Sequence, residues 1–421
     1  MIVELINTGS ELMIGSTLNT HHQWLGQQFA LLGSRIERQV SVADTGEAIE
    51  QAVRESLGRA DVVVVTGGLG PTSDDLTRDR VASLLGCGLH EDSSVVKQIE
   101  AFFAARNRSM PDRTRIQAQV PDGAFVIQNA YGTAPGLAID VPAGKFRDAA
   151  EGSVLIMLPG PPRELRPMFR DSVAPLLRGR FSELAAFQCR VLRSTGLGES
   201  HVEERVGPLL QELIGRGLEV GYCARLGAVD VRLAVRGPEG DALVDEAEGI
   251  VRATIGKWIF GVEGEELESV VLRLLKERQG TLSIAESCTG GFVSHRITNV
   301  PGASAVFLAG LVTYSNEAKQ AFLGVRGQTL VEHGAVSQET ASEMAEGIRD
   351  RSGATYGLSV TGIAGPGGGT AEKPVGTAFV ALAGPKPTVT LRLLNPFDRE
   401  SFKQATSQQA LELLRRGLSG D

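Results

Sequence analysis

Hydrophobic positions in the first part of the chain fall into two patterns, short apolar runs and sets spaced for helices. The run Asp61–Val65 shows no alternation, which is typical of a parallel strand buried on both faces. Helix-spaced apolar sets end near Gly33, Gly58 and Gly86. Strands are expected at residues 2–6, 61–65 and 154–158, and helices around residues 24–32, 49–57 and 76–85. The alternation predicts a largely parallel sheet with its ligand at the carboxyl ends of the strands.

The rest of the chain shows the same patterns in two further arrangements. Strands at 188–193 and 229–236, with helices after 199 and over 242–255, predict a small α+β unit. Beyond it, expected helices are 267–275, 337–351 and one opening at 398, and expected strands are 281–285, 305–312, 355–360, 375–382 and 388–394. We therefore predict an α/β protein of three domains, at residues 1–165, 166–260 and 261–421.

Composition and charge exclude several classes of protein. Apolar residues make up 42% and charged residues 22% of the 421 residues, which is an ordinary globular mixture. The net charge of -8 argues against broad contact with a nucleic-acid backbone. The cysteines Cys87, Cys189, Cys223 and Cys288 lie far apart, which argues against a zinc ribbon or a disulfide framework. The N-terminus lacks a basic stretch and no apolar run approaches the about 20 residues that cross a bilayer, so we expect a cytoplasmic protein without a membrane partner.

A glycine-rich loop, Thr66–Gly70, follows the strand at 61–65. Such a loop lets backbone amides approach an anion, and the start of the next helix adds a favourable dipole. It is neither a P-loop nor a G-x-G-x-x-G fingerprint. Asp74 and Asp75 follow, where they either cap the expected helix or hold a divalent metal that bridges a diphosphate. A similar sequence, Thr361–Pro366, follows the strand at 355–360 and suggests a second anion site.

Ser287 and Lys319 are the candidate catalytic pair. Ser287 follows the strand at 281–285, where a turn into a helix would expose a nucleophile or simply provide a helix cap. If Asn316 is an N-cap, Lys319 lies in the first turn of a helix, where the dipole disfavours the ammonium by about 0.3–1 kcal/mol. That position favours the neutral amine of a general base, although the ammonium could also bend into solvent. Cys288 is a rival nucleophile, for which the sequence supplies no partner base.

The first domain resembles the molybdopterin-binding fold of molybdenum cofactor enzymes through Gly9–Leu12 with Asn19-Thr20 and Thr66–Thr72 with Asp74-Asp75. With Pro159–Pro162 closing it, the domain resembles the N-terminal half of the competence/damage-inducible protein A (CinA) family. The resemblance implies metal-dependent cleavage of ADP-ribose-type diphosphates, using Mg²⁺ or Co²⁺ with or without potassium. The implied anion site is Glu11, Asn19, Thr66, Gly67, Gly68 and Gly70, and the implied metal ligands are Asp74 and Asp75.

In family terms the middle domain resembles a KH-like connector. Its candidate loop, Gly215-Arg216-Gly217, departs from the G-x-x-G clamp that holds nucleic acid in KH domains. A spacer or dimerisation role is therefore favoured over RNA binding, and we expect a homodimer.

The last domain resembles the CinA C-terminal domain, a nicotinamide mononucleotide (NMN) deamidase. Three segments carry this resemblance, Ala285–Gly291, Tyr314–Lys319 and Val360–Pro366. It implies hydrolysis of the carboxamide to nicotinate mononucleotide and ammonia without a metal. The family's active-site pattern falls on Ser287, Ser304, Tyr314, Lys319, Thr361 and Arg399. Lys403 stands where relatives often have a second arginine, and lysine cannot make a bidentate phosphate contact.

These residues suggest an acyl-enzyme mechanism. Neutral Lys319 takes the proton of Ser287, whose oxygen attacks the carboxamide carbon, and Lys319 then returns the proton to ammonia. Backbone amides around Cys288–Gly291, including those of Thr289 and Gly290, would hold the oxyanion. Tyr314 would orient Lys319 or relay protons. The residues expected to bind the substrate's 5′-phosphate are Thr361, Gly362, Gly365 and Arg399.

The leading hypothesis is thus an enzyme of pyridine nucleotide recycling that acts on NMN and ADP-ribose. Two alternatives remain open from the sequence. Residues 1–165 could transfer adenylyl groups to molybdopterin, or the chain could be a non-enzymatic partner in DNA uptake or repair. The acidic charge and the lack of basic or aromatic tracts weigh against direct DNA contact.

Overall fold

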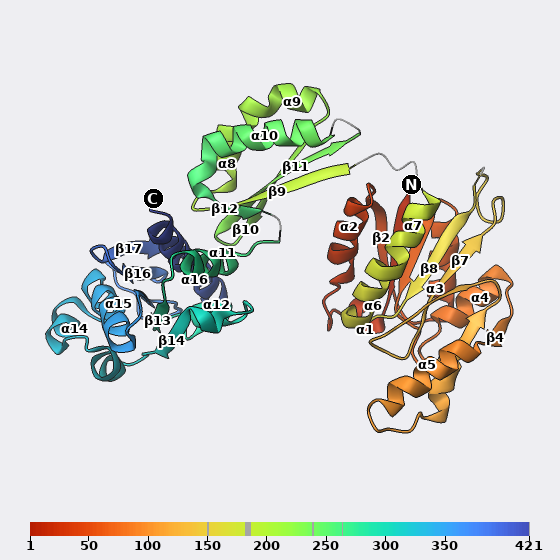
Figure 1. Cartoon of the computed structure of the whole chain (residues 1–421), viewed down its shortest axis with the longest axis horizontal. Helices are drawn as coiled ribbons and strands as arrows, with labels where there is room; N and C mark the ends of the chain where they lie inside the picture. Colours follow the sequence, from red (N-terminus) through yellow and green to blue (C-terminus); the bar gives the residue numbers. More distant parts are fainter. Residues whose placement is uncertain (150, 182–186, 238–239, 263, 421) are drawn as a thin grey trace. The chain divides into compact units, whose positions relative to one another are not determined.

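The computed structural model describes residues 1–149, 151–181, 187–237, 240–262 and 264–420. The chain divides into two compact units, the first made chiefly of Met1–Gln188 and the second of most of the chain from Cys189 onward. Figure 1 shows the elements of each unit along the sequence. The second unit holds both the middle and the C-terminal domain.

A mixed sheet in the order β2-β1-β3-β8-β7-β6 organises the first unit. The strands β2, β1, β3 and β8 run parallel, whereas β7 pairs antiparallel with both of its neighbours, β8 and β6. The sheet is therefore mixed at this edge, which agrees with a parallel or mixed sheet in the first domain. The sequence did not predict the individual strands between residues 89 and 141. The strands of this unit are β1 (Val3–Thr8), β2 (Ile36–Val42), β3 (Val62–Thr66), β4 (Leu89–Glu91), β5 (Gln119–Pro121), β6 (Phe125–Ile127), β7 (Gly136–Val141) and β8 (Ser153–Leu158).

Helices cover both faces of this sheet because successive strand residues point to opposite sides. Val62 and Val64 pack with one group of helices, and Val63 and Val65 pack with the other. The first group is α2 (His21–Leu31), α6 (Pro162–Met168), the π-helical turn η2 (Phe169–Val173) and α7 (Ala174–Arg180), and the second is α3 (Gly46–Leu57), α4 (Thr77–Leu85) and α5 (Ser93–Ala104). The short helix α1 (Ser10–Met13) and the 3₁₀ helix η1 (Asp112–Ala118) complete the unit.

The first domain extends beyond the expected boundary at residue 165. Leu165, Phe169 and Leu177 are fully buried in the same core as Phe29 and Ile156. Figure 1 shows α6 and α7 in front of the sheet that contains β8. Pro161 and Pro162 therefore begin a helix that covers this sheet instead of ending the domain.

The middle domain has a four-stranded sheet in the order β10-β11-β9-β12. Its core joins residues of these strands to helices α8 and α10, as the α+β prediction required. Its elements are β9 (Phe187–Thr195), α8 (Glu199–Val206), η3 (Gly207–Leu210), α9 (Gln211–Gly215), β10 (Glu219–Arg225), β11 (Ala228–Arg236), α10 (Gly240–Ile255), η4 (Gly256–Trp258) and β12 (Ile259–Val262).

The C-terminal domain has a five-stranded sheet in the order β14-β13-β15-β16-β17. β14, β13 and β15 are parallel, and β16 and β17 form the expected antiparallel hairpin. Residues of α11, α12 and α16 pack on one face, and residues of α15 on the other. Its strands are β13 (Leu282–Glu286), β14 (Phe307–Val312), β15 (Tyr356–Gly362), β16 (Thr377–Ala383) and β17 (Val389–Leu394). Its helices are α11 (Leu267–Glu277), α12 (Phe292–Thr298), η5 (Ala303–Ala305), α13 (Asn316–Ala318), η6 (Lys319–Leu323), α14 (Gly327–His333), α15 (Gln338–Ser352) and α16 (Arg399–Ser419).

Candidate functional sites

Ser287 and Lys319 meet at the carboxyl edge of the C-terminal sheet. Ser287 directly follows β13, and Lys319 begins the π-helical turn η6 after β14. The Lys319 Nζ lies 3.2 Å from the Ser287 Oγ. It also donates to the carbonyl oxygens of Thr313, at 2.9 Å, and of Tyr314, at 3.4 Å. A neutral amine has two N–H groups for these carbonyls, which leaves its lone pair for the hydroxyl proton of Ser287.

Burial holds Lys319 away from water. Its side chain is only 1% exposed, so the interpretation as a solvated ammonium is wrong. Desolvation lowers the pKa of Lys319 from its ordinary value, because burial disfavours the charged form. This environment suits a general base that must be neutral near physiological pH.

Asn316 is not the N-cap, so the condition under which Lys319 would be the third residue of the helix is not met. Ser315 caps the helix, with its hydroxyl accepting the Ala318 amide at 3.1 Å. Lys319 therefore lies one position later than expected, and its amine returns to carbonyls at the end of β14. Burial is the main cause of its lowered pKa.

Glu286 holds the turn after Ser287 in place. This residue is part of the Ala285–Gly291 motif, but no role was predicted for it from the sequence. Its buried carboxylate accepts the amides of Gly291 at 3.0 Å, Val293 at 3.1 Å and Ser294 at 2.9 Å. The Ser294 hydroxyl donates to it as well, at 2.7 Å. A carboxylate at the N-terminus of α12 also matches the helix dipole. A glutamate before a G-G pair at a helix start was the signal for this role.

Glu286 narrows the choice of oxyanion donors. The Gly291 amide is bound to Glu286, and the Gly290 amide donates to the Ser287 carbonyl at 3.1 Å. The expectation that these two amides hold an oxyanion is therefore wrong. The amides of Cys288 and Thr289 remain. Among the described residues no carbonyl oxygen accepts from them, and both lie beside the Cys288 sulfur. The residue after a nucleophile commonly supplies such a donor.

Cys288 does not have the properties of a reactive thiol. The side chain is 5% exposed, and burial raises its pKa to about 12. Thiolate is the nucleophilic form, so this cysteine would be almost wholly protonated near neutral pH.

Arg399 connects two of the expected substrate-binding segments. It donates to the Tyr314 hydroxyl at 2.8 Å and to the Gly365 carbonyl at 3.0 Å. The Tyr314 side chain is 61% exposed, and the contact of Tyr314 with Lys319 is made by its backbone carbonyl. Lys403 places a second cation near the turn that follows Ser287. Its Nζ is 3.8 Å from the position that a Cβ on Gly290 would occupy.

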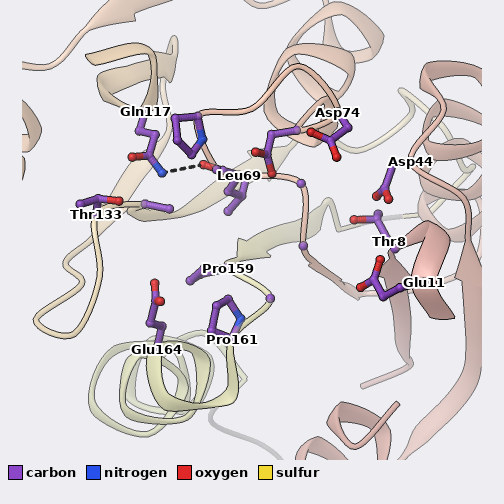
Figure 2. A pocket seen from close by; sticks show the side chains of 18 residues that line it. Thr8, Glu11, Asp44, Leu69, Asp74, Gln117, Thr133, Pro159, Pro161 and Glu164 are labelled. Atoms are coloured by element: carbon purple, nitrogen blue, oxygen red, sulfur yellow. Dashed lines mark hydrogen bonds between the residues drawn. The ribbon is translucent and has the colours of Figure 1, made fainter. Parts of the chain in front are cut away.

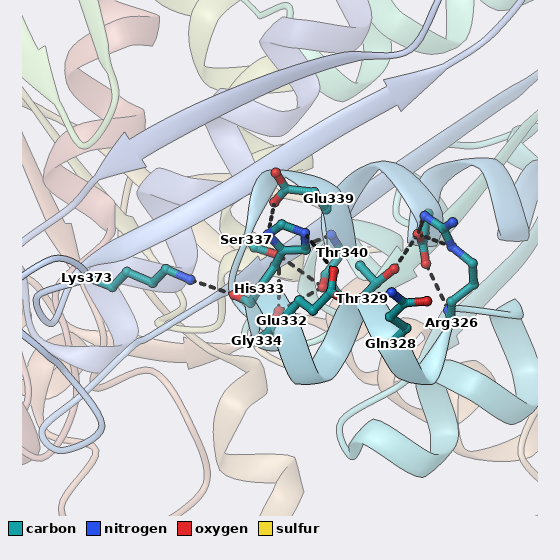
Figure 3. Close-up of polar contacts among 11 residues, drawn as sticks. Arg326, Gln328, Thr329, Glu332, His333, Gly334, Ser337, Glu339, Thr340 and Lys373 are labelled. Atoms are coloured by element: carbon teal, nitrogen blue, oxygen red, sulfur yellow. Dashed lines mark hydrogen bonds and ion pairs between the residues drawn. The ribbon is translucent and has the colours of Figure 1, made fainter.

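Thr361, which was expected to bind the substrate phosphate, instead makes a hydrogen bond within the protein. Its buried hydroxyl donates to the Ala335 carbonyl at 2.8 Å, in the turn between α14 and α15. Figure 3 shows how side chains around this turn bind it, with Ser337 and Thr340 both donating to the Gly334 carbonyl. Gly362 belongs to β15 and pairs with Ala378 in the sheet. The hydroxyl proton of Thr361 is thus already used.

Ser304 does not join the pair within one chain. It lies in η5, and the neighbouring Val306 carbonyl accepts the amide of Leu282 at the start of β13. Ser287 follows the other end of that strand. Since β13 and β14 are parallel, Ser304 and Ser287 lie at opposite edges of the sheet.

A cavity of about 400 Å³ lies at the carboxyl edge of the parallel strands in the first unit. Figure 2 shows it between the glycine loop and the loop after β8. Of the predicted residues, those lining it are Glu11, Gly67, Gly68, Gly70, Asp74 and Asp75. Asn19 and Thr66 instead line a cavity of about 140 Å³ that shares Thr8, Glu11 and Gly160 with it. The sequence motifs therefore located this edge of the sheet.

Sequence reasoning missed Asp44, Gln117, Thr133 and Glu164, which also line the large cavity. They come from the segment after β2, from η1, from the connection between β6 and β7, and from α6. None of these residues belongs to a local motif. Only the fold brings them together.

The glycines of the loop are required by close approach. Gly67 has a φ of +99°, and a Cβ there would lie 2.7 Å from the Thr8 carbonyl oxygen. Gly68 has a φ of +67°, and a Cβ there would collide with the Thr77 hydroxyl. Both conformations lie in the left-handed region that favours glycine. The loop thus packs closely against β1 and the start of α4.

Asp74 and Asp75 do not cap α4. The helix begins at Thr77, and its N-cap residue Leu76 offers no side-chain cap. Asp75 instead accepts from the amide of Thr72 at 2.8 Å and from the Thr72 hydroxyl. Asp74 is fully exposed, and a hydrogen bond from Thr72 lowers its pKa, so it is ionised at neutral pH.

The oxygen ligands that line this cavity could hold a divalent ion only if substrate phosphates supplied further ligands. Carboxylates of Glu11, Asp44 and Asp74 line the cavity, and oxygen is the ligand that Mg²⁺ prefers. Within the described ranges, no group of three or more His, Cys, Asp or Glu residues is arranged to hold a metal. Mg²⁺ commonly completes its shell with water and substrate phosphates, so the residues present fit such an ion together with a diphosphate.

Three family models match the chain in succession. "Probable molybdopterin binding domain" matches residues 4–179, "Damage-inducible protein CinA KH domain" matches 189–261, and "CinA C-terminal domain" matches 264–418. A "CinA-like protein" of Akkermansia muciniphila is 45% identical over 413 residues, covering 97% of this chain and 95% of that relative. The chain belongs to the CinA family.

Solved structures of the CinA family match part of the chain. The competence/damage inducible protein CihA of Agrobacterium tumefaciens is 41% identical and covers 36% of this chain and 93% of its own, with a TM-score of 0.35. The competence damage-inducible protein A (ComA) of Klebsiella pneumoniae is 37% identical and covers 36% of this chain and 95% of its own, with a TM-score of 0.36.

CinA membership confirms the expected order of a molybdopterin-binding-like domain, a KH-like domain and a CinA C-terminal domain. The first family model reaches residue 179, which agrees with the packing of α6 and α7 on the first sheet. In the part of the chain that is described, no helix is long and apolar enough to cross a bilayer.

Proposed function

We propose that the C-terminal domain hydrolyses the carboxamide of NMN to nicotinate mononucleotide and ammonia. The single observation that carries this proposal is the contact of 3.2 Å between the Lys319 Nζ and the Ser287 Oγ, with the lysine buried. A hydroxyl beside a desolvated amine is a nucleophile with its own base.

The reaction then runs in two halves. Ser287 Oγ attacks the carboxamide carbon while its proton passes to the Lys319 Nζ, which gives a tetrahedral oxyanion. Collapse of this species breaks the C–N bond, and Lys319 returns the proton to the leaving nitrogen, which departs as ammonia. Lys319 next removes a proton from water, whose oxygen attacks the acyl carbon. The acyl C–Oγ bond then breaks, and Lys319 returns that proton to the Ser287 Oγ, which frees both residues for the next cycle.

Amides of Cys288 and Thr289 are the donors proposed for the oxyanion, because Glu286 and Ser287 occupy the two that follow. Arg399 and Lys403 supply positive charge for the 5′-phosphate near Gly365 and Gly290. The pyridinium ring of the substrate is cationic and would further favour a neutral Lys319.

The test is ammonia release from NMN by the full chain. Ser287→Ala should lower kcat by roughly 10⁴- to 10⁶-fold, the range typical of nucleophile removal. Cys288→Ala is the matched control, with the neighbouring side chain truncated in the same way, and it should retain most activity. Hydroxylamine should divert the acyl-enzyme to the hydroxamate. Loss of activity in Cys288→Ala with full activity in Ser287→Ala would transfer the role to the thiol.

We further propose that the N-terminal domain cleaves a nucleoside diphosphate sugar of the ADP-ribose type with a divalent metal. Carboxylates and the amides of the glycine loop line one cavity, and among the described residues neither lysine nor arginine lines it. A dianionic substrate would therefore need a cation there. The ion, when bound, would neutralise and polarise the diphosphate, while Gly67–Gly70 would position a phosphate and Asp74 would face the metal.

The test is release of AMP from ADP-ribose with Mg²⁺ or Co²⁺. Asp74→Asn should reduce cleavage strongly. Asp148→Asn is the matched control, because Asp148 is exposed in the connection between β7 and β8, at the opposite edge of the sheet. A wild-type chain that leaves ADP-ribose intact but transfers adenylyl groups from ATP to molybdopterin would overturn this proposal.

A further inference from the structure

Gln117 carries a buried oxygen without a partner at the edge of the large cavity. The side chain is 2% exposed and lies on η1. Its Nε2 donates to the Leu69 carbonyl at 3.3 Å, whereas its Oε1 has no hydrogen-bond partner among the described residues. Because the Leu69 carbonyl can only accept, the amide orientation is fixed with Nε2 toward Leu69. A buried acceptor left unpaired is costly, so native structures usually provide a partner.

The position of Gln117 indicates what that partner is. Gln117 lines the cavity of about 400 Å³ together with Leu69 and Thr133. Figure 2 shows Gln117 and Thr133 on one side of the cavity, and Asp44 and Glu11 on the other. Gln117 therefore lies on the side of the cavity away from the carboxylates of Asp44 and Glu11, and Glu164 lines the cavity on the same side as Gln117. A phosphate and its cation are expected near Asp44 and Glu11, so the rest of a nucleotide would extend toward Gln117.

The segment that carries Gln117 is fixed to the glycine loop at two points. Arg113, on the same 3₁₀ helix, donates through its Nε to the Pro71 carbonyl at 2.7 Å. Gln117 binds the loop four residues further along η1, at Leu69. The distance between the acceptor and a phosphate held by this loop is thus set before any ligand binds, and such preorganisation favours selective binding.

We propose that the Oε1 of Gln117 accepts a hydrogen bond from a neutral donor of a nucleotide bound in this cavity and thereby selects the nucleotide. This inference rests on the nucleotide diphosphate function proposed above. The donor chemistry is an N–H or O–H group, which a nucleotide offers either as the amino group of its base or as a ribose hydroxyl. Gln117 is a specificity-determining residue in this assignment.

The experiment measures equilibrium binding of AMP to the full chain by calorimetry, without any turnover. The probes are AMP, purine riboside 5′-monophosphate, which lacks only the amino group, and the 2′-deoxy and 3′-deoxy forms of AMP. One of the three analogues should bind wild type about 10- to 100-fold more weakly than AMP, the loss expected when a buried acceptor stays unpaired. The analogue that loses affinity identifies the donor.

Gln117→Leu should bind AMP as weakly as wild type binds that analogue, and should no longer distinguish the two. Gln98→Leu is the matched control, because the Gln98 Oε1 is also buried without a partner while its Nε2 donates to the Asn129 carbonyl, and Gln98 does not line this cavity. The control should bind AMP like wild type.

Three results would overturn the inference. They are equal binding of all four nucleotides by wild type, wild-type affinity for AMP in Gln117→Leu, and no binding of AMP at all. The analogue series needs no variant, so a folding defect in Gln117→Leu leaves the inference testable. If AMP shows the expected pattern while ADP-ribose is not cleaved, Gln117 keeps its role and the diphosphatase proposal fails. If ADP-ribose is cleaved and no analogue loses affinity, the diphosphatase proposal stands and the role of Gln117 fails.

Discussion

Replacing Lys319 with methionine removes the proposed base while keeping an unbranched side chain of similar length in the buried site. The amine lies 3.2 Å from the Ser287 Oγ, within reach for direct proton transfer. General-base catalysis commonly contributes about 10²- to 10⁴-fold, so kcat for ammonia release should fall by that factor. This corresponds to about 3–5 kcal/mol of transition-state free energy.

The same substitution should change how stability depends on pH. Burial lowers the pKa of Lys319 in the folded state. Between that lowered value and about 10.4, the ordinary value for lysine, the unfolded chain binds more protons, so the wild-type free energy of unfolding increases as pH rises. The slope from this one group is at most about 1.4 kcal/mol per pH unit. The variant lacks this group. The difference in free energy of unfolding between the variant and wild type should therefore favour the variant most at low pH and become smaller as pH rises through this window.

Both effects can be measured on the full chain. Ammonia release gives kcat/KM against pH, and the wild-type rate should fall as pH drops through the lowered pKa of Lys319, because protonation removes the base. Hydrogen exchange of amides in β13 and β15 reports the stability of this domain alone. Lys386→Met is the control, since Lys386 is exposed between β16 and β17, at the opposite edge of the sheet. The reasoning is refuted if Lys319→Met keeps more than a tenth of kcat, or if its stability relative to wild type is the same from pH 7 to pH 10.

Three further changes have defined outcomes. Arg399→Ala should raise KM for NMN about tenfold or more with little change for nicotinamide riboside, which lacks the phosphate, and equal losses on both substrates in steady-state assays would contradict a phosphate role. Glu286→Gln leaves fewer acceptors for three amides and a hydroxyl, so kcat for NMN should fall while Cys288 becomes more accessible to a thiol reagent; an unchanged kcat would show that this turn does not need the carboxylate. Gly68→Ala should destabilise the first unit by about 1–3 kcal/mol, because its φ of +67° is unfavourable for alanine, and calorimetry should show a lower Tm for that transition alone.

The sequence determined the elements that carry the C-terminal site, because their signals are local. The apolar run before Ser287 predicted a buried strand, and β13 ends at Glu286 as that run requires. The helix-spaced positions from Leu267 predicted α11. The glycine loops after Thr66 and after Gly362 follow buried strands as expected. Parallel strands align their carboxyl ends, which is why loops far apart in sequence could be expected at one edge.

The tertiary structure alone decided the chemistry within those loops. Burial of Lys319 and its return to the carbonyls of Thr313 and Tyr314 depend on the packing around η6, and no local pattern specifies them. Glu286 binds amides that follow it by five to eight residues, and Gln117 reaches a loop 48 residues earlier in the chain. Hydrogen bonds and desolvation act over a few ångströms in space, whereas residue patterns record only distance along the chain. The motifs therefore located the two sites, and the packing set which atoms in them can react or bind.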